Sequence, residues 1–511
     1  MMRCSMVYIK SNPDQTRLLP VDIRAIIPKS HICYLIEEVV NDLDYSEFDK
    51  QVEGAGSPSY HPRIALKLLL NGVCDRVTST RKLEKLTNEN IVYMYLAEGQ
   101  HPDFHTIAMF RKRNSELIKC CFLATIAIAK KLDLINFNKL YLDGTKIKAN
   151  ASKSKTFTKE EIEYLNNFID ESLKNMDKTD DEEDQLYDDT KGEPKIPEHL
   201  THKSKLREKI KQIREQLKGE KGVKTATRVM KKTSARQINL TDPDSALLRM
   251  KKGHFEQGYN AQIVVEDKGE FVVCNYLSNS PTDVGETIPT IEKLKEEQEI
   301  SLQGVEMFQD NGYSSPATAE YYAKAGAIAY IPDVLTTQIL HGKKKSIEQF
   351  HHDNFILDLK KNEATCPRGH IMPFHRKKII NRNNTGRWTN VYRCGNCPNC
   401  PSNVLCIPRG ADKKYKFIEI NPYMYAIRQR FKEKVGVEKY NKRFHKGEIA
   451  NAHILHNLGY RSFQTKGIES CKNELNMMCI AYNLKKLHLK AMDALSKFRE
   501  LFIFERLFFE L

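Results

Sequence analysis

The sequence predicts an α/β protein in which a mixed sheet is flanked by helices and follows an all-helical N-terminal region. Apolar residues recur at helical spacing between residues 30 and 135. From residue 139 onward, short apolar stretches and helical patterns follow one another in the order strand, strand, strand, helix, strand, helix, strand, helix. Two long segments, 153–250 and 334–425, interrupt this order and are predicted to be insertions.

The N-terminal region, residues 1–135, reads as a series of short helices. Helical periodicity is clear in Ile32–Val40 and in Ile64–Leu69, and His61-Pro62 indicates a helix start. Several short helices with basic ends are typical of a helix-turn-helix-type DNA-binding domain. A plain helical bundle would give the same pattern.

The predicted sheet begins at Lys139, and its elements can be assigned in order along the chain. We expect strands at 139–149, 258–266, 271–277, 304–310 and 327–331, helices at 285–297 and 316–325, and a last helical region beyond residue 425. This is the order of a ribonuclease-H-like fold. Its core would comprise residues 136–152, 251–333 and 426–490, with a C-terminal helix at 491–511.

The first insertion, residues 153–250, reads as a charged helical hairpin. Leu206, Ile210, Ile213 and Leu217 have coiled-coil spacing, and an acidic run at 180–184 marks the tip. The basic arm could contact DNA or a second subunit. A solvated hairpin without a partner fits equally well.

Five of the thirteen cysteines lie in the second insertion, residues 334–425. Cys394, Cys397 and Cys400 form two overlapping C-x-x-C steps, which is the spacing of structural zinc sites. Cys366, Cys394, Cys397 and Cys406 are one candidate ligand set, in which Cys400 could replace a neighbour. Reduced thiols without a metal are the alternative.

Net charge and hydropathy limit the classes of partner that the protein can have. The chain has 511 residues, enough for about three domains, and its 81 Lys and Arg against 66 Asp and Glu leave a net charge of +15. Such a balance favours a nucleic-acid partner, although a lysine-rich proteome would also produce it. No apolar run approaches the ~18 residues of a membrane span, and we find no signal peptide. We therefore expect a bacterial cytoplasmic protein with no membrane partner.

Three acidic residues stand where a ribonuclease-H-like fold would bring them together. Asp143 is on the first predicted strand, Asp310 ends the fourth, and Glu448 is in the last helical region. Converging carboxylates suit two Mg²⁺ ions, which can activate an attacking oxygen and stabilise a leaving one at a phosphodiester. Asp143, Asp310 and Glu448 are therefore the predicted magnesium ligands.

The surroundings of Glu448 form a motif of their own. Tyr440, Phe444 and Glu448 are four residues apart and would share one helical face. Arg443 beside that face could bind a DNA phosphate through its planar guanidinium, and Tyr440 could pack near the cleaved strand. Glu474 is a rival third acid. Asp283 could support the metal ligands, although a turn or helix-start residue is the simpler interpretation.

These motifs, taken in order, resemble the DDE transposases of bacterial insertion sequences. The resemblance covers most of the chain and rests on the following segments: 60–62, 102–106, 143–151, 241–243, 258–262, 310–313, the cysteine-rich insertion, 459–463 and 481–486. In the related tyrosine-arginine-glutamate-lysine signature a lysine follows the glutamate by seven residues, whereas this chain has Leu455. Lys446 or His456 could replace that cation, or the copy could be impaired.

The resemblance implies a definite activity. Asp143, Asp310 and Glu448 would bind two Mg²⁺ ions while water cleaves the element end, and the freed 3′-hydroxyl would then attack target DNA. The N-terminal helices would bind terminal inverted repeats, and two copies would pair two DNA ends. A ribonuclease-H-like metal-dependent nuclease and a catalytically decayed, zinc-stabilised DNA-binding protein are the alternatives.

Overall fold

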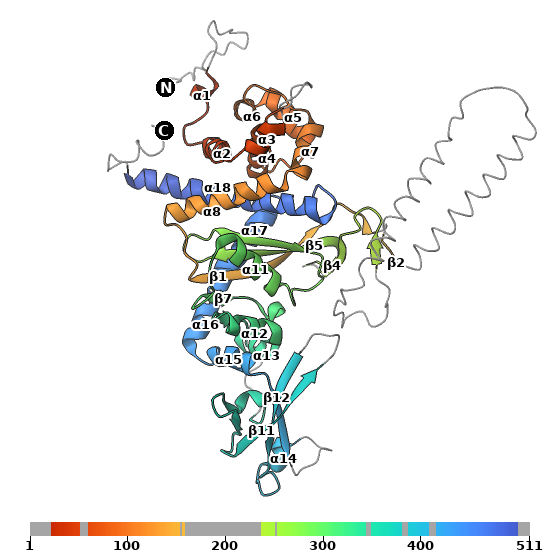
Figure 1. The fold of residues 1–511 in the computed structure, drawn as a ribbon, viewed down its shortest axis with the longest axis vertical. Coiled ribbons are helices and arrows are strands. Elements are labelled where there is room, and N and C mark those ends of the chain that lie inside the picture. The colour runs from red at the N-terminus through yellow and green to blue at the C-terminus, as the bar shows by residue number, and fades with distance from the viewer. Residues whose placement is uncertain are drawn as a thin grey trace, which may run out of the picture.

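The protein is described here by a computed structural model covering residues 22–51, 60–153, 156–158, 237–250, 253–343, 349–380, 387–407 and 415–498. The coiled-coil positions predicted within 153–250 lie outside these residues. Within them, a helical region, a mixed sheet and a smaller antiparallel sheet follow one another along the longest axis of the molecule (Figure 1).

The N-terminal region is helical, as the periodicity predicts. Its elements are α1 (Ile23–Ile26), α2 (Ile32–Asn41), α3 (Ser46–Gln51), α4 (Pro62–Cys74), α5 (Thr80–Glu89), α6 (Ile91–Leu96), α7 (Phe104–Arg113) and α8 (Ser115–Lys131). The start of α4 is set by His61, whose imidazole accepts the backbone N–H of Arg63 at 3.2 Å, and by Pro62 in the first turn. Because α4 lies at the centre of the region, its residues from Ile64 to Cys74 are buried.

The main sheet has the predicted ribonuclease-H-like arrangement. Its strands are β1 (Lys139–Lys148), β4 (Ala246–Arg249), β5 (Phe255–Glu266), β6 (Val272–Ser278), β7 (Glu306–Phe308) and β8 (Ile328–Tyr330). Among the described residues their order is β4-β5-β1-β7-β8, and β6 also pairs with β5. β1 is antiparallel to β5 but parallel to β7, and β7 is parallel to β8. The sheet is therefore antiparallel on one side of β1 and parallel on the other.

One strand of this sheet comes from the segment that the sequence assigned to the first insertion. β4 pairs with β5 through Ala246↔Gly258 to Arg249↔Phe255, so residues 246–249 join the sheet before position 251. A short ribbon of β2 (Thr156–Thr158) and β3 (Gln237–Asn239) closes the base of the insertion.

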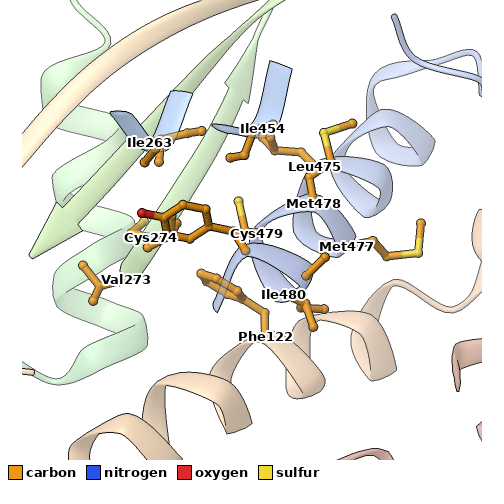
Figure 2. Close-up of a cluster of buried hydrophobic side chains, with 14 of the residues drawn as sticks. Phe122, Ile263, Val273, Cys274, Ile454, Leu475, Met477, Met478, Cys479 and Ile480 are labelled. Atoms are coloured by element: carbon orange, nitrogen blue, oxygen red, sulfur yellow. The ribbon is translucent and has the colours of Figure 1, made fainter. Parts of the chain in front are cut away.

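Helices from both ends of the chain cover the sheet. α11 (Thr287–Gln298) and α12 (Pro316–Lys324) connect its strands, and α18 (Ile468–Phe498) packs against α8, α4 and β6. Figure 2 shows Cys479 of α18 next to Cys274 of β6, and Ile480 of the same helix beside Phe122 of α8. The buried core is consequently continuous from the N-terminal helices to the sheet. Residues 491–498 prolong α18 and do not begin a separate helix.

The cysteine-rich insertion has a sheet and a core of its own. β9 (Ile356–Asp358), β10 (Glu363–Thr365), β11 (Ile371–Ile380), β12 (Arg387–Cys394) and β13 (Lys416–Ile420) pair in the order β13-β12-β11-β10-β9. Phe355, Met372, Tyr392 and Ile418 are among its buried residues. The chain enters it through α13 (Val334–Leu340) and returns through α15 (Pro422–Arg430), with the short α14 (Asn403–Cys406) near its far end (Figure 1).

Two further helices bring the chain back over the sheet. α16 (Lys434–Asn441) is followed after one residue by α17 (Arg443–Ala452), which packs on β1 and β5. The helix is therefore interrupted at Lys442, and the single helical face expected from Tyr440 to Glu448 is divided between two helices. No helix among the described residues is both long enough and apolar enough to cross a membrane.

Candidate active site

Asp143 and Asp310 stand at equivalent positions of neighbouring parallel strands. Tyr141 of β1 is paired with Phe308 of β7, and each acid follows two residues later. Alternation along β1 places Asp143 on the same side as Tyr141, whose ring stacks on that of Phe308 with centroids 4.9 Å apart. Asp310 lies two residues beyond the end of β7, so the parallel pairing brings both acids to one edge of the sheet.

The carboxylate of Asp310 is hydrogen-bonded within its own turn and has a raised pKa. Its Oδ1 accepts the backbone N–H of Gly312 at 2.8 Å and so begins the short 3₁₀ helix Asn311–Tyr313. Burial raises the pKa of Asp310 to about 6, and the negative charges of Asp143 and Asp283 add to this effect, which Arg443 partly opposes. A carboxylate in such surroundings gains from a nearby cation.

Glu448 reaches the acids because α17 crosses β1 at a glycine. A Cβ atom at Gly447 would lie 3.3 Å from Tyr141 Cβ and 3.7 Å from Asp143 Cβ. A larger residue there would lift α17 from the strand. The next residue, Glu448, keeps 39% of its side chain exposed, whereas that of Asp143 is 16% exposed. The open side of the site is therefore the side of Glu448.

Arg443 joins the first and third acids. Its Nη1 lies 3.3 Å from Asp143 Oδ1 and its Nη2 lies 2.9 Å from Glu448 Oε1. Only 12% of this side chain is exposed. The DNA-phosphate contact predicted for Arg443 would have to compete with these two ion pairs, because both ends of the guanidinium already bind carboxylates.

Asn451 is a member of the site that sequence reasoning missed. Its side-chain amide donates to Asp143 Oδ2 at 2.8 Å, so Arg443 and Asn451 hold the two oxygens of Asp143 from the same helix. Asn451 comes three residues after Glu448, which is the spacing of neighbours on one helical face. That spacing was the available signal.

Tyr440 belongs to an aromatic cluster beneath the site. Its ring packs edge-on against Phe431 at 5.3 Å, and Arg443 Cζ lies 5.8 Å from its centroid. Tyr330 and Phe308 continue the cluster to Tyr141. Tyr440 therefore packs within the protein, and its place near the cleaved DNA strand stays a prediction.

The residues considered as a replacement for the signature lysine, or as a rival third acid, lie away from the three acids. Leu455 packs against the hydrophobic core, and Lys446 donates to Glu270 at 2.9 Å and to the Asp267 carbonyl at 3.1 Å. Glu474 is fully buried and accepts the backbone N–H groups of Gln464 and Thr465. Lys446 is thus engaged away from the three acids, and Glu474 braces the loop before α18.

Asp283 lies close to the acids. Its Oδ1 accepts the side-chain amides of Asn260 at 2.9 Å and Gln262 at 3.0 Å, both from β5. Tyr313, three residues after Asp310, donates its hydroxyl to Gln262 Oε1. A hydrogen-bonded chain therefore connects the loop of Asp310 with Asp283.

The cysteines of the insertion surround one small enclosed cavity of about 20 Å³, which Cys366, Cys394, Cys397, Cys400, Cys406 and His370 help to line. The backbone N–H of His370 donates to Cys366 Sγ at 3.3 Å across a tight turn. The cavity can hold one small ion. However, no three of these sulfur atoms lie within 4.8 Å of one another. Among the described residues, a different group of side chains has three ligand atoms that close together.

That group is His351, His352 and Asp353. Asp353 Oδ1 already accepts Arg428 Nη1 at 2.7 Å, while Arg428 Nε binds Asp333 Oδ2 at 2.7 Å. A guanidinium between two carboxylates supplies the positive charge that a metal would bring. We interpret this cluster as the anchor that ties α15 to the insertion, and sequence reasoning did not detect it.

The sheet order, with a helix carrying an acid across β1, defines a ribonuclease-H-like protein. Two family models match the chain: a Transposase domain (DUF772) at residues 21–113 and a Transposase DDE domain at residues 365–488. Together the two matches indicate a DDE-type transposase of the insertion-sequence kind. The second match includes Glu448 and the cysteines, whereas Asp143 and Asp310 precede it. A comparison with curated proteins found no match.

Proposed function

We propose that this transposase cleaves the ends of its element and joins them to target DNA at Asp143, Asp310 and Glu448. The observation that carries the proposal is the bridge from Arg443 to Asp143 and Glu448, beside the half-buried Asp310. Acids from two strands and a helix meet there, and one face of the cluster is open to solvent through Glu448.

The donor set suits two Mg²⁺ ions. Asp143, Asp310 and Glu448 offer carboxylate oxygens, which Mg²⁺ prefers, and the pKa of Asp310 is raised first by burial and then by the negative charge of Asp143. Bound Mg²⁺ would polarise the phosphodiester and favour deprotonation of the attacking hydroxyl. Arg443 keeps Asp143 and Glu448 together before any cation binds, and Asn451 orients Asp143 through its second oxygen.

Cleavage of labelled element ends tests this assignment. Asp143→Asn should abolish Mg²⁺-dependent cleavage, because the amide keeps the shape of the side chain but loses its charge. Asp133→Asn is the matched control, since that aspartate is 90% exposed and lies outside the cluster. Cleavage by Asp143→Asn at the wild-type rate would refute the proposal.

Products distinguish transposition from other activities. A transposase should join a labelled 3′-hydroxyl end to target DNA, whereas a nuclease of the same fold would release cut ends only. A decayed copy would bind the element ends and leave them uncut with any divalent metal. We also infer that two copies pair two ends, which a measurement of the mass of the DNA complex would test.

The N-terminal helices are the proposed DNA-binding surface. Exposed cations lie on two of them: Arg81, Lys82 and Lys85 on α5, and Lys112 and Arg113 on α7. Lys82→Ala should weaken binding to inverted repeats and lower the salt dependence by about one phosphate contact. Lys434→Ala, which removes a 90% exposed lysine of α16, is the control. We also propose that the protein acts in the cytoplasm, associated with the nucleoid, because its proposed substrate is DNA.

We further propose that the cysteine cavity holds a structural Zn²⁺. Thiolates are the preferred ligands of structural zinc, and binding would draw the sulfur atoms together from their present spacing. Metal analysis of the purified chain should find one zinc per molecule, lost in Cys394→Ser and retained in Cys120→Ser, whose cysteine is exposed on α8. Loss of zinc from Cys400→Ser would add that thiol to the ligands. A zinc-free wild-type chain would overturn this proposal.

A further inference from the structure

Asp283 contacts the sheet from the face opposite to α17. Gln262 is paired with Gly144 of β1, and cross-strand partners point to the same face. Asp143, as the neighbour of Gly144, points to the other face. Gly144 makes the approach of Asp283 possible, because a Cβ atom there would lie 2.6 Å from Asp283 Oδ1 and 2.9 Å from the Tyr313 hydroxyl.

One oxygen of Asp283 is held by two hydrogen bonds, and the other lies near Gly312, as does an oxygen of Asp310. Asn260 and Gln262, both fully buried, donate to Oδ1, and no described residue donates a hydrogen bond to Oδ2. A Cβ atom at Gly312 would lie 3.4 Å from Asp283 Oδ2 and 3.0 Å from Asp310 Oδ1. The two carboxylates therefore face the same small space above Gly312.

This arrangement exceeds what a turn requires. A turn aspartate needs only local backbone hydrogen bonds, whereas Asp283 engages two buried amides of β5, one of which also accepts the hydroxyl of Tyr313. It adds a further anion to a site that already holds Asp143 and Asp310. Carboxylates so close together repel one another unless a cation lies nearby.

On the basis of the proposed function, we propose that Asp283 is a positioning residue of the metal centre. Its Oδ2 accepts a hydrogen bond from a water molecule that is bound to the cation at Asp310. Mg²⁺ retains several of its waters in protein sites. Groups that hold the ligands of a metal commonly change its affinity about 10–100-fold when they are removed. Asp283 would thus orient a cation that it does not touch.

The test is a calorimetric titration of the full chain with Mn²⁺, without DNA. Asp283→Asn should weaken Mn²⁺ binding about 10–100-fold, because the asparagine oxygen can still accept the amides of Asn260 and Gln262 while the charge is lost. Asp283→Glu, which keeps the charge, should bind more tightly than Asp283→Asn. Asp133→Asn controls for the loss of one negative charge, and circular dichroism confirms folding.

The outcomes separate the two proposals. Mn²⁺ binding that is lost in Asp143→Asn and unchanged in Asp283→Asn overturns the role of Asp283 and leaves the catalytic assignment standing. Equal weakening in Asp283→Asn and Asp283→Glu would assign Asp283 a purely structural part, which also overturns the inference. A wild-type chain that binds no Mn²⁺ overturns both. If Asp283→Asn does not fold, the Mn²⁺ affinity of Asp283→Glu tests the inference. An affinity at least 10-fold lower than that of the wild-type chain, in this folded and still charged variant, would refute the water contact.

Discussion

Removal of Arg443 should loosen α17 in the absence of a divalent cation. The guanidinium pairs with Asp143 at 3.3 Å and with Glu448 at 2.9 Å. One ion pair near 4 Å is worth about 4 kcal/mol at an effective dielectric constant of 20, and breaking a buried pair costs about 3–5 kcal/mol. Because Glu448 is 39% exposed, solvent screening reduces this value, and we expect about 2 kcal/mol for Arg443→Ala.

Hydrogen exchange measures that loss where it occurs. A change of about 2 kcal/mol corresponds to a roughly 30-fold increase in local opening, so the amides of α17 should exchange about 30 times faster in Arg443→Ala in the presence of a chelator. Saturating Mg²⁺ should restore much of the protection, since the cation replaces the lost positive charge between the acids.

Two comparisons make the result specific. Arg443→Lys keeps the charge with fewer donors and should give an intermediate rate. Peptides of β10 and β11, in the separate core of the insertion, should be unaffected. If α17 exchanges equally fast in wild type and Arg443→Ala, or if Mg²⁺ leaves the difference unchanged, then Arg443 does not serve as the internal counter-charge of these acids.

Three other predictions follow from the same site. Because the pKa of Asp310 is raised to about 6, Mn²⁺ affinity should fall about tenfold for each pH unit below that value. The cation-free protein should lose stability as pH rises from about 4 to 6. Mn²⁺ binding that does not change between pH 5 and 7 would contradict this prediction. Gly447→Leu should displace α17 and reduce cleavage about 100-fold, whereas Gly395→Leu, at a position with nothing within 4 Å, should not. Glu474→Gln should lower stability to urea by about 1–3 kcal/mol and leave Mn²⁺ affinity unchanged. Glu448→Gln should weaken Mn²⁺ binding and leave stability unchanged. If instead Glu474→Gln weakens Mn²⁺ binding and Glu448→Gln does not, Glu474 is the third acid.

The order of the helices and strands could be predicted because short apolar runs in the sequence indicate the buried strands. β5 and β6 are almost wholly buried, and each contains a short apolar run, Ile263–Val265 and Val272–Cys274, that indicates a strand. The same reasoning placed Asp143 on the first strand and Asp310 at the end of the strand that pairs beside it. Their proximity then follows from parallel pairing alone.

Contacts between distant elements could not be predicted in this way. The pairing of β4 with β5 depends on where a long insertion returns to the sheet, which its own residues do not specify. The amide of Asn451 and the guanidinium of Arg443 meet Asp143 only because α17 crosses β1 at Gly447. The interruption at Lys442 has no proline or glycine at the break itself to indicate it.

The single core shared by α18, α8 and the sheet has a consequence for synthesis of the protein. α18 follows the sheet in chain order and is synthesised after it, yet its Cys479 and Ile480 are fully buried in the core that it shares with β6. Earlier parts of the chain must therefore keep apolar surface uncovered until α18 has been synthesised. A chain that stops before α18 would leave this apolar surface exposed and would be a target for proteolysis.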